Sequence, residues 1–485
     1  MDNLKDKTVT GLFWNLVERV GLRVIQFTPI VILARLLSPE EFGLIGMLAI
    51  FIALARTFLD SGFGLALIQK SEITYVDECS MFFFNISVGI IAVILFFVAA
   101  PWIAAFYAQP SLTPLTRWLS LDVLIESFAL VQIARLTRAL DFKTLVKANL
   151  LATIFSSVFG IAAAYLGMGV WSLVIQTISD TILQTANLWW LSSWRPAWIF
   201  SRTSLKSMFR FGSHMLGSSL IATFFDNLYH VFIGKYFSAS SLGYYTRSSS
   251  LKNIVVDTTS ATLARVLFPA LSNIQDDMER LKRAYRKSVI LITFIHFPLM
   301  LGLIVVATPL INLLFSAKWS ESILYFQLMC TAGILYPLQV VNLEILKVKG
   351  RSDLFFQLTL IKRMLMIVAI LITFRWGIPA MLIGQIVNAV IGYGLNSYYS
   401  DRLIGYSISS QIADWFPNLF YAFLAAAGAW WIGTMLDQSD WLMLSVEITV
   451  GAGVFIALNA ATRSEPLLEI VALSRQYLVP RLFKG

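Results

Sequence analysis

The chain has 485 residues, of which 58% are hydrophobic and only 13% are charged, and its mean hydropathy is +0.74. Because soluble proteins carry about 25% charged and roughly 45–50% apolar residues, this composition excludes a soluble domain. The net charge of +9 does not indicate a nucleic-acid partner, since the basic residues lie mostly between hydrophobic runs. There they set membrane orientation and contact anionic membrane lipids.

The first predicted helix covers residues 12–36 and is long enough to cross a membrane, which takes about 20 residues. It nevertheless carries a polar stripe with the helical period, beside Glu18: Asn15, Arg19, Arg23 and Gln26. A charge at the centre of a bilayer costs roughly 3 kcal/mol even on a lenient scale. The stripe must therefore face a protein interior or a water-filled cavity, and we interpret it as the lining of a transport pathway.

Apolar runs along the whole chain predict about fourteen crossings of roughly 20 residues each. They lie near residues 12–36, 43–68, 80–106, 116–138, 147–167, 169–191, 208–236, 248–273, 287–314, 322–346, 354–375, 377–400, 415–436 and 441–461. No connection between them is long enough to fold as a separate domain. The predicted fold class is an all-α integral membrane protein with about fourteen transmembrane helices.

Two short motifs recur later in the chain in the same order. Leu33–Gly43 is echoed by Ile233–Gly243, and Gly169–Ile175 is echoed by Gly377–Ile383. Recurrence in the same order indicates a duplicated unit of about six crossings. We therefore predict two pseudo-symmetric six-helix bundles, followed by two additional C-terminal helices with a tail: residues 1–206, 207–406 and 407–485.

The distribution of basic residues predicts the orientation in the membrane. When both termini are placed in the cytoplasm, most Lys and Arg residues of the connections fall on the cytoplasmic side. The opposite connections hold little beyond Arg117, Lys235, Arg247, Lys252 and Lys318. By the positive-inside rule, we expect a multi-pass protein with both termini cytoplasmic.

Charged residues inside the predicted crossings are the most informative group, because such residues usually mark functional sites. Several are spaced by four and share a helix face: Arg19/Arg23, Arg56/Asp60, Asp122/Glu126 and Asp226/His230. For Arg56 and Asp60, a local ion pair that helps the helix insert and a functional role fit the sequence equally well. The candidates for ion coupling are carboxylates: Glu18, Asp60, Asp122, Glu126 and Asp226.

Three arginines lack a cancelling charge in their own segment. Arg19 and Arg23 share one face with only Glu18 nearby, and Arg265 has no acidic residue one turn away. A cation held in a membrane needs an anion from the protein or from a ligand. A diphosphate is the obvious membrane-borne anion, since guanidinium forks match phosphate oxygens.

No catalytic constellation is found. The sequence has no Gly-rich phosphate loop, no H-E-x-x-H and no G-x-S-x-G, and Cys79 and Cys330 belong to no metal-ligand spacing. We therefore predict a protein that is not an enzyme, with no catalytic residue, metal site or cofactor. Ion antiport or the membrane potential would then drive transport.

Four segments resemble the polysaccharide-transporter branch of the MOP flippase superfamily, and most of all its colanic-acid-exporter-like (Wzx-type) members. They are Leu33–Gly43 (LARLLSPEEFG), Arg138–Lys143 (RALDFK), Arg265–Asp277 (RVLFPALSNIQDD) and Phe297–Pro337. The resemblance implies two six-helix bundles with two extra helices, and translocation of an undecaprenyl-diphosphate-linked oligosaccharide across the bacterial inner membrane. It also implies substrate-binding cations on the first, second and eighth helices, at Arg19 or Arg23, Arg56 and Arg265.

Two other functions are weighed against this one. A multidrug antiporter of the same superfamily should have an acidic, aromatic cavity, whereas this sequence places arginines in its membrane segments. A membrane polysaccharide polymerase or ligase should have a long outward loop with polar catalytic residues, and the outward connections here are short. For the flippase we expect a monomer that works beside a polysaccharide polymerase and glycosyltransferases.

Overall fold

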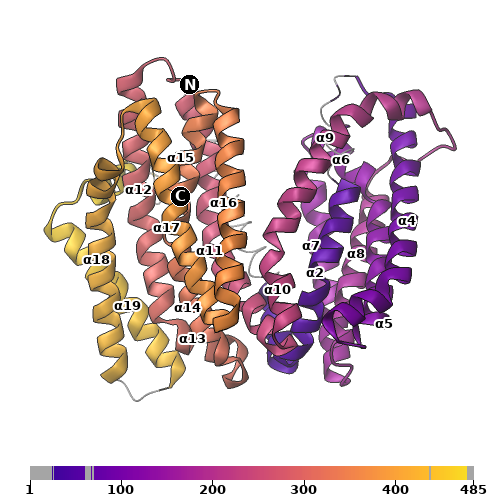
Figure 1. Ribbon diagram of the computed structural model, residues 1–485, viewed down its shortest axis with the longest axis horizontal. Coiled ribbons are helices and arrows are strands. Elements are labelled where there is room, and N and C mark those ends of the chain that lie inside the picture. Colours follow the sequence, from indigo (N-terminus) through magenta and orange to yellow (C-terminus); the bar gives the residue numbers. More distant parts are fainter. Residues whose placement is uncertain are drawn as a thin grey trace, which may run out of the picture. The chain divides into compact units, whose positions relative to one another are not determined.

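The computed structural model describes residues 27–60, 72–435 and 439–477, and the single positions 25, 67 and 70. Within these residues the regular elements are helices, with no strand. This agrees with the membrane setting, because a helix satisfies its backbone hydrogen bonds within one segment. The chain divides into two compact units, Met1–Thr246 and Arg247–Gly485, and each is a bundle of long helices (Figure 1).

Unit 1 contains helical residues 27–36 and the helices that follow. These are α2 (Pro39–Asp60), α4 (Tyr75–Tyr107), α5 (Leu112–Ser127), α6 (Leu130–Arg138), α7 (Phe142–Tyr165), α8 (Trp171–Leu191), α9 (Arg202–Asp226) and α10 (Leu228–Tyr236). The first residues of α11 (Ala239–Ser272) also belong to it. The boundary between the two six-helix bundles, at residues 206/207, remains a prediction. Unit 1, which is defined by compactness, extends past this boundary because α9 and α10 pack on α2 and α4.

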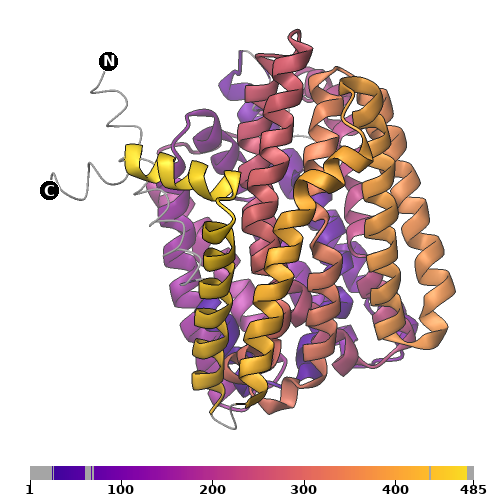
Figure 2. The same ribbon diagram turned by 90° about the vertical axis from the view of Figure 1, so that its left-hand side faces the viewer.

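Unit 2 contains the rest of α11 and the helices after it. These are α12 (Met278–Val305), α13 (Ala307–Phe315), η1 (Ala317–Trp319), α14 (Glu321–Gly333), α15 (Tyr336–Val348), α16 (Ser352–Thr373), η2 (Phe374–Trp376), α17 (Ile378–Ile404), α18 (Ile408–Met435), α19 (Asp440–Ala461) and α20 (Glu465–Tyr477). The short helix α20 runs crosswise to α19 (Figure 2). Glu469 on α20 pairs with Lys287 near the start of α12.

The predicted all-α membrane fold is confirmed. Among the described residues, eight helices are long and apolar enough to cross a membrane. Several predicted crossings are helix pairs rather than single helices: residues 116–138 form α5 and α6, and 208–236 form α9 and α10. At the break between α9 and α10, the Asn227 side-chain amide donates to the Thr223 carbonyl at 2.9 Å. A side chain thus competes with the backbone N–H groups for a carbonyl at the end of the helix.

The first pair of recurring motifs meets in a reciprocal contact inside unit 1. A Cβ on Gly43 would lie 1.7 Å from the Ala239 carbonyl oxygen, and a Cβ on Gly243 would lie 1.9 Å from the Pro39 carbonyl oxygen. Since neither position tolerates a side chain, α2 and the start of α11 approach each other backbone to backbone. The positions that correspond in the two motifs thus form the same contact from both sides, which supports the predicted duplication.

The connections predicted to be cytoplasmic lie together within each unit. In unit 1 the Arg138 guanidinium donates to the Lys70 carbonyl at 2.6 Å, and Tyr75 donates to the Arg195 carbonyl at 2.7 Å. In unit 2 the Lys349 ammonium donates to the Gln275 carbonyl at 2.6 Å. Each unit therefore gathers its basic connections at one end of its bundle.

Candidate substrate and ion-coupling site

The sequence-predicted site falls partly outside the described residues. Both the backbone and the side chain of Glu18, Arg19 and Arg23 lie outside the described residues. For Asp60, the last residue of α2, and Arg265, within α11, the helix is described but the side chain is not. The roles predicted for these five residues therefore remain predictions.

The described part of the site is a charged cluster in unit 1. Arg56 on α2 pairs with two carboxylates of α5: its Nη2 lies 2.6 Å from Asp122 Oδ2, and its Nε lies 3.0 Å from Glu126 Oε2. The Asp122 side chain is completely buried, whereas the Arg56 side chain is 40% exposed. The helix spacing explains the pairing, because Asp122 and Glu126 are four apart and present both carboxylates to one guanidinium.

The helix α8 completes the surroundings of Asp122. The Thr181 hydroxyl on α8 donates to Asp122 Oδ1 at 2.5 Å. The preceding residue, Asp180, accepts a hydrogen bond from the Ser156 hydroxyl of α7 at 2.9 Å. Four helices thus contribute polar groups to one region of the bundle, and Asp122 accepts hydrogen bonds from residues of α2 and α8.

The cluster carries more negative than positive charge. One guanidinium faces two carboxylates, so its net charge is −1 when both are ionised and +1 when both bind protons. The Arg56 cation is therefore compensated by the protein itself in this arrangement. For Arg56 the sequence left a local ion pair with Asp60 and a functional role equally open, and because the Asp60 side chain lies outside the described residues that pair remains a prediction. The described partners of Arg56 come from α5, and Asp122 lies 66 residues further along the chain.

Asp226, another predicted carboxylate, is exposed at the last residue of α9. The residue one turn before it, Thr223, bonds with Thr57 through their hydroxyl oxygens at 2.9 Å. Thr57 is the neighbour of Arg56 on α2. Asp226 and His230, which the spacing predicted to share one helix face, belong to two different helices, because α9 ends at Asp226 and α10 begins at Leu228.

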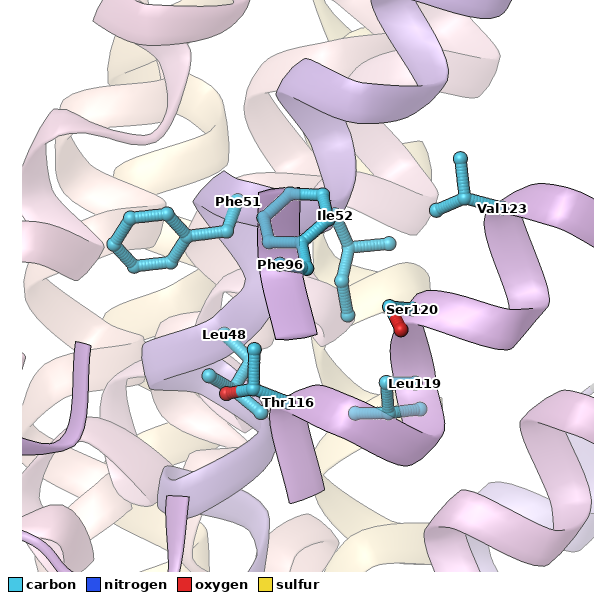
Figure 3. A pocket seen from close by; sticks show the side chains of 8 residues that line it. All are labelled: Leu48, Phe51, Ile52, Phe96, Thr116, Leu119, Ser120 and Val123. Carbon is cyan, nitrogen blue, oxygen red and sulfur yellow. The ribbon is translucent and has the colours of Figure 1, made fainter. Parts of the chain in front are cut away.

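An apolar pocket lies between α2, α4 and α5, next to the charged cluster along α5 (Figure 3). Phe51 and Ile52 of α2, Phe96 of α4 and Val123 of α5 line it, and Thr116 and Ser120 supply its only hydroxyl groups. With no charged lining residue it is unsuited to a phosphate. With a cavity volume of about 10 Å³ it is also too small for anything larger than a water molecule.

The sequence analysis missed two residues of chemical interest. Thr181 gave no signal, because a hydroxyl in a membrane helix usually bonds its own backbone. Lys362 lies in the apolar run of α16 and packs closely on α17. A Cβ placed on Gly392 of α17 would be only 3.2 Å from the Lys362 Cδ atom. A search for every cation inside a crossing would have found it.

Comparison with known proteins shows several to which this chain is similar. A family model described as "Polysaccharide biosynthesis protein" matches residues 32–324. The chain is 28% identical to the lipopolysaccharide biosynthesis protein WzxC of Escherichia coli (strain K12) over 405 residues, which cover 81% of each chain. It is 27% identical to the succinoglycan biosynthesis transport protein ExoT of Rhizobium meliloti (strain 1021), over 84% of each chain.

A solved structure shares the fold. The lipid II flippase MurJ in an inward closed conformation superposes with a TM-score of 0.76 at 13% identity, over 92% of this chain and 98% of that one. This match shows the fold, while the family match and the two relatives confirm the resemblance to polysaccharide transporters that the motifs indicated.

Proposed function

The chain belongs to the polysaccharide biosynthesis protein family, and on this premise we propose that it is a lipid-linked oligosaccharide flippase. It moves polysaccharide repeat units on undecaprenyl diphosphate across the bacterial inner membrane by alternating access. The names of WzxC and ExoT, which refer to polysaccharide biosynthesis and transport, support this function. Both termini are cytoplasmic in this proposal, and the lipid-linked substrate arrives from glycosyltransferases and leaves towards a polymerase.

The observation that carries the proposal is the Arg56 cluster. A guanidinium inside an apolar membrane bundle is the group that best matches a diphosphate. Its two carboxylate partners, at 2.6 Å and 3.0 Å, hold it while they are ionised. When Asp122 or Glu126 binds a proton or another coupling cation, Arg56 becomes available to the diphosphate.

This exchange couples ion binding to substrate binding without a nucleotide. The coupling cation neutralises a carboxylate, and the released guanidinium recruits the anion, so each ligand strengthens the binding of the other. In the same proposal Arg19, Arg23 and Arg265 supply further cations for the diphosphate. Glu18, Asp60 and Asp226 are the remaining candidates for ion coupling.

The multidrug antiporter is the second candidate, and the net negative charge of the cluster favours it. A cationic drug would replace the coupling cation beside Asp122 and Glu126, but Arg56 would then oppose its binding. Expression of the protein in a drug-sensitive strain distinguishes the two functions. We expect no gain in resistance to cationic dyes from a protein that restores polysaccharide export.

Export by a flippase-deficient strain tests the proposal through a paired substitution. Replacing Arg56 alone would leave the buried Asp122 charge unpaired, which costs about 3–5 kcal/mol and can remove the protein from the membrane. Arg56→Met combined with Asp122→Leu removes both charges together. We expect this double variant to accumulate in the membrane, as measured by immunoblotting, and to export no surface polysaccharide.

A matched control uses an ion pair of unit 2. The Arg286 guanidinium donates to both carboxylate oxygens of Asp414 at 2.7 Å and 2.8 Å, so Arg286→Met with Asp414→Leu removes an arginine–aspartate pair away from the proposed site. We expect this control to retain export. Normal export by the Arg56/Asp122 double variant would show that its ion pair is only structural.

A further inference from the structure

The carboxyl group of Glu447 on α19 is buried in the contact between α18 and α19. The residue is 2% exposed, and neither carboxyl oxygen has a hydrogen-bond partner within the described chain. This differs from Asp414 on α18, whose carboxylate accepts from Arg286 and from Tyr406. Buried polar groups are nearly always hydrogen-bonded, so Glu447 calls for an explanation.

The contact between the two helices is shaped around this carboxyl. A Cβ on Gly433 of α18 would lie 2.3 Å from Glu447 Oε1, so the carboxyl occupies the space that a side chain at position 433 would take. One turn away, a Cβ on Gly451 of α19 would lie 3.6 Å from the Ala429 Cβ. Small residues thus let the helices approach closely, and the Glu447 side chain fills the space that Gly433 leaves.

No cation among the described residues lies close enough to pair with Glu447. On α18 the titratable residues are Asp414 and Tyr421, about 28 Å and 18 Å from Gly433 along the helix at 1.5 Å per residue. Asp440 on α19 accepts from Asn312 of α13 at 3.3 Å, and α13 itself has no titratable residue. In the turn between α18 and α19, Asp437 lies outside the described residues.

The third helix that packs on α19 is α12, and the charged residues of α12 lie away from Glu447. Phe294 packs on Phe455 of α19 with ring centroids 5.1 Å apart, so Glu447, two turns earlier on α19, faces the apolar C-terminal part of α12. His296 is held by Thr259 and the Gly333 carbonyl. The other titratable residues of α12 occupy its start: Glu279, Arg280, Lys282, Arg283, Tyr285, Arg286 and Lys287.

We infer that Glu447 is a proton-binding site, which keeps α18 packed on α19 only while its carboxyl is neutral. An ionised carboxylate in this place would be buried without a partner, and that costs far more than burying the neutral acid. Raising the pH favours the ionised carboxylate, so we expect the packing of α18 on α19 to weaken as the pH rises.

Infrared spectroscopy of the purified protein in lipid nanodiscs tests the protonation directly. At neutral pH we expect the carbonyl band of a neutral carboxylic acid in the wild type and its loss in Glu447→Gln. The control is Glu469→Gln, which removes a carboxylate paired with Lys287 and should leave the band in place. An identical band in the wild type and Glu447→Gln overturns the inference.

Thermal unfolding from pH 5 to pH 9, followed by tryptophan fluorescence, tests the link to packing. We expect the wild type to lose stability relative to Glu447→Gln as the pH rises. A constant difference over this range would contradict the inference. If Glu447→Gln does not accumulate, Glu447→Met, which keeps the volume without a titratable group, replaces it. The test needs no substrate, so its outcome is independent of the proposed transport function.

Discussion

Asp122 is the residue on which the charged cluster of unit 1 depends, because it connects three helices. Its carboxylate accepts from Arg56 of α2 and from Thr181 of α8, while its own backbone belongs to α5. The side chain is completely buried, so no water replaces a lost donor. Charge-assisted hydrogen bonds of this kind are worth about 1.5–3 kcal/mol.

Removing the Thr181 hydroxyl should therefore weaken the protein. We expect Thr181→Val to lower the free energy of unfolding by about 1–3 kcal/mol, because Asp122 loses a buried donor. Thermal or denaturant unfolding in detergent measures the change.

The control is Thr177→Val, one turn earlier on α8. Its hydroxyl bonds only within its own helix, to the Leu173 carbonyl at 2.9 Å, so we expect a change within about 0.5 kcal/mol. Equal effects at the two positions would mean that the bond to Asp122 contributes nothing specific.

At the scale of elements, the starts of α2 and α11 show one structure built twice. In each motif a serine precedes the helix and its hydroxyl accepts from the backbone N–H three residues on: Ser38 from Glu41 at 3.4 Å, and Ser238 from Ser241 at 3.1 Å. This cap satisfies a backbone donor that the first turn leaves free. The glycine that follows in each motif then permits the close crossing of the two helices.

A methyl group at either glycine should force these helices apart. We expect Gly43→Ala and Gly243→Ala each to destabilise the protein by about 1–3 kcal/mol, the usual effect of overpacking, since the obstacle is a backbone carbonyl. Unfolding temperature and accumulation in the membrane measure the effect.

Gly428→Ala on α18 serves as the comparison. A Cβ there meets nothing within 4 Å, and alanine favours a helix over glycine by up to about 1 kcal/mol. We expect this variant to be neutral or slightly more stable. If Gly43→Ala behaves in the same way, the reciprocal contact is not tight in solution.

At the scale of the whole molecule, membrane orientation depends on charges that lie far apart in the sequence. Within unit 2, Lys349 bonds near the start of α12, and Arg286 pairs with Asp414 near the start of α18. At the other end of that bundle, Asn312 bonds Asp440 at the start of α19. The basic connections thus share one end, as the positive-inside rule requires.

Reporter fusions test the orientation. We expect a fusion after Lys318 to report a location outside the cytoplasm and a fusion at the C-terminus to report the cytoplasm. An odd number of predicted crossings separates the two positions, so they lie on opposite sides of the membrane. A phosphatase and a fluorescent protein, each active on one side only, give the two signals. The same signal from both positions would contradict the predicted topology.

The sequence by itself determined the fold class, the likeness to polysaccharide transporters and the paired motifs. Hydropathy and charge depend on local composition, and a bilayer permits few structures for apolar segments of this length. Leu33–Gly43 and Ile233–Gly243 were recognisable because a close helix crossing requires glycine at a fixed distance from the cap. Spacing by four also predicted that Asp122 and Glu126 share one helix face, and both contact Arg56.

Only the tertiary structure decided which groups on different helices meet. Nothing in the sequence near Arg56 indicated that Asp122 and Glu126 of α5 contact it, or that Thr181 of α8 donates to Asp122. In the same way, Glu447 was visible as a charge inside a crossing, but nothing local showed that it faces Gly433 and lacks a partner. Helical periodicity relates residues one or two turns apart, whereas contacts between helices depend on how side chains of distant segments fit together.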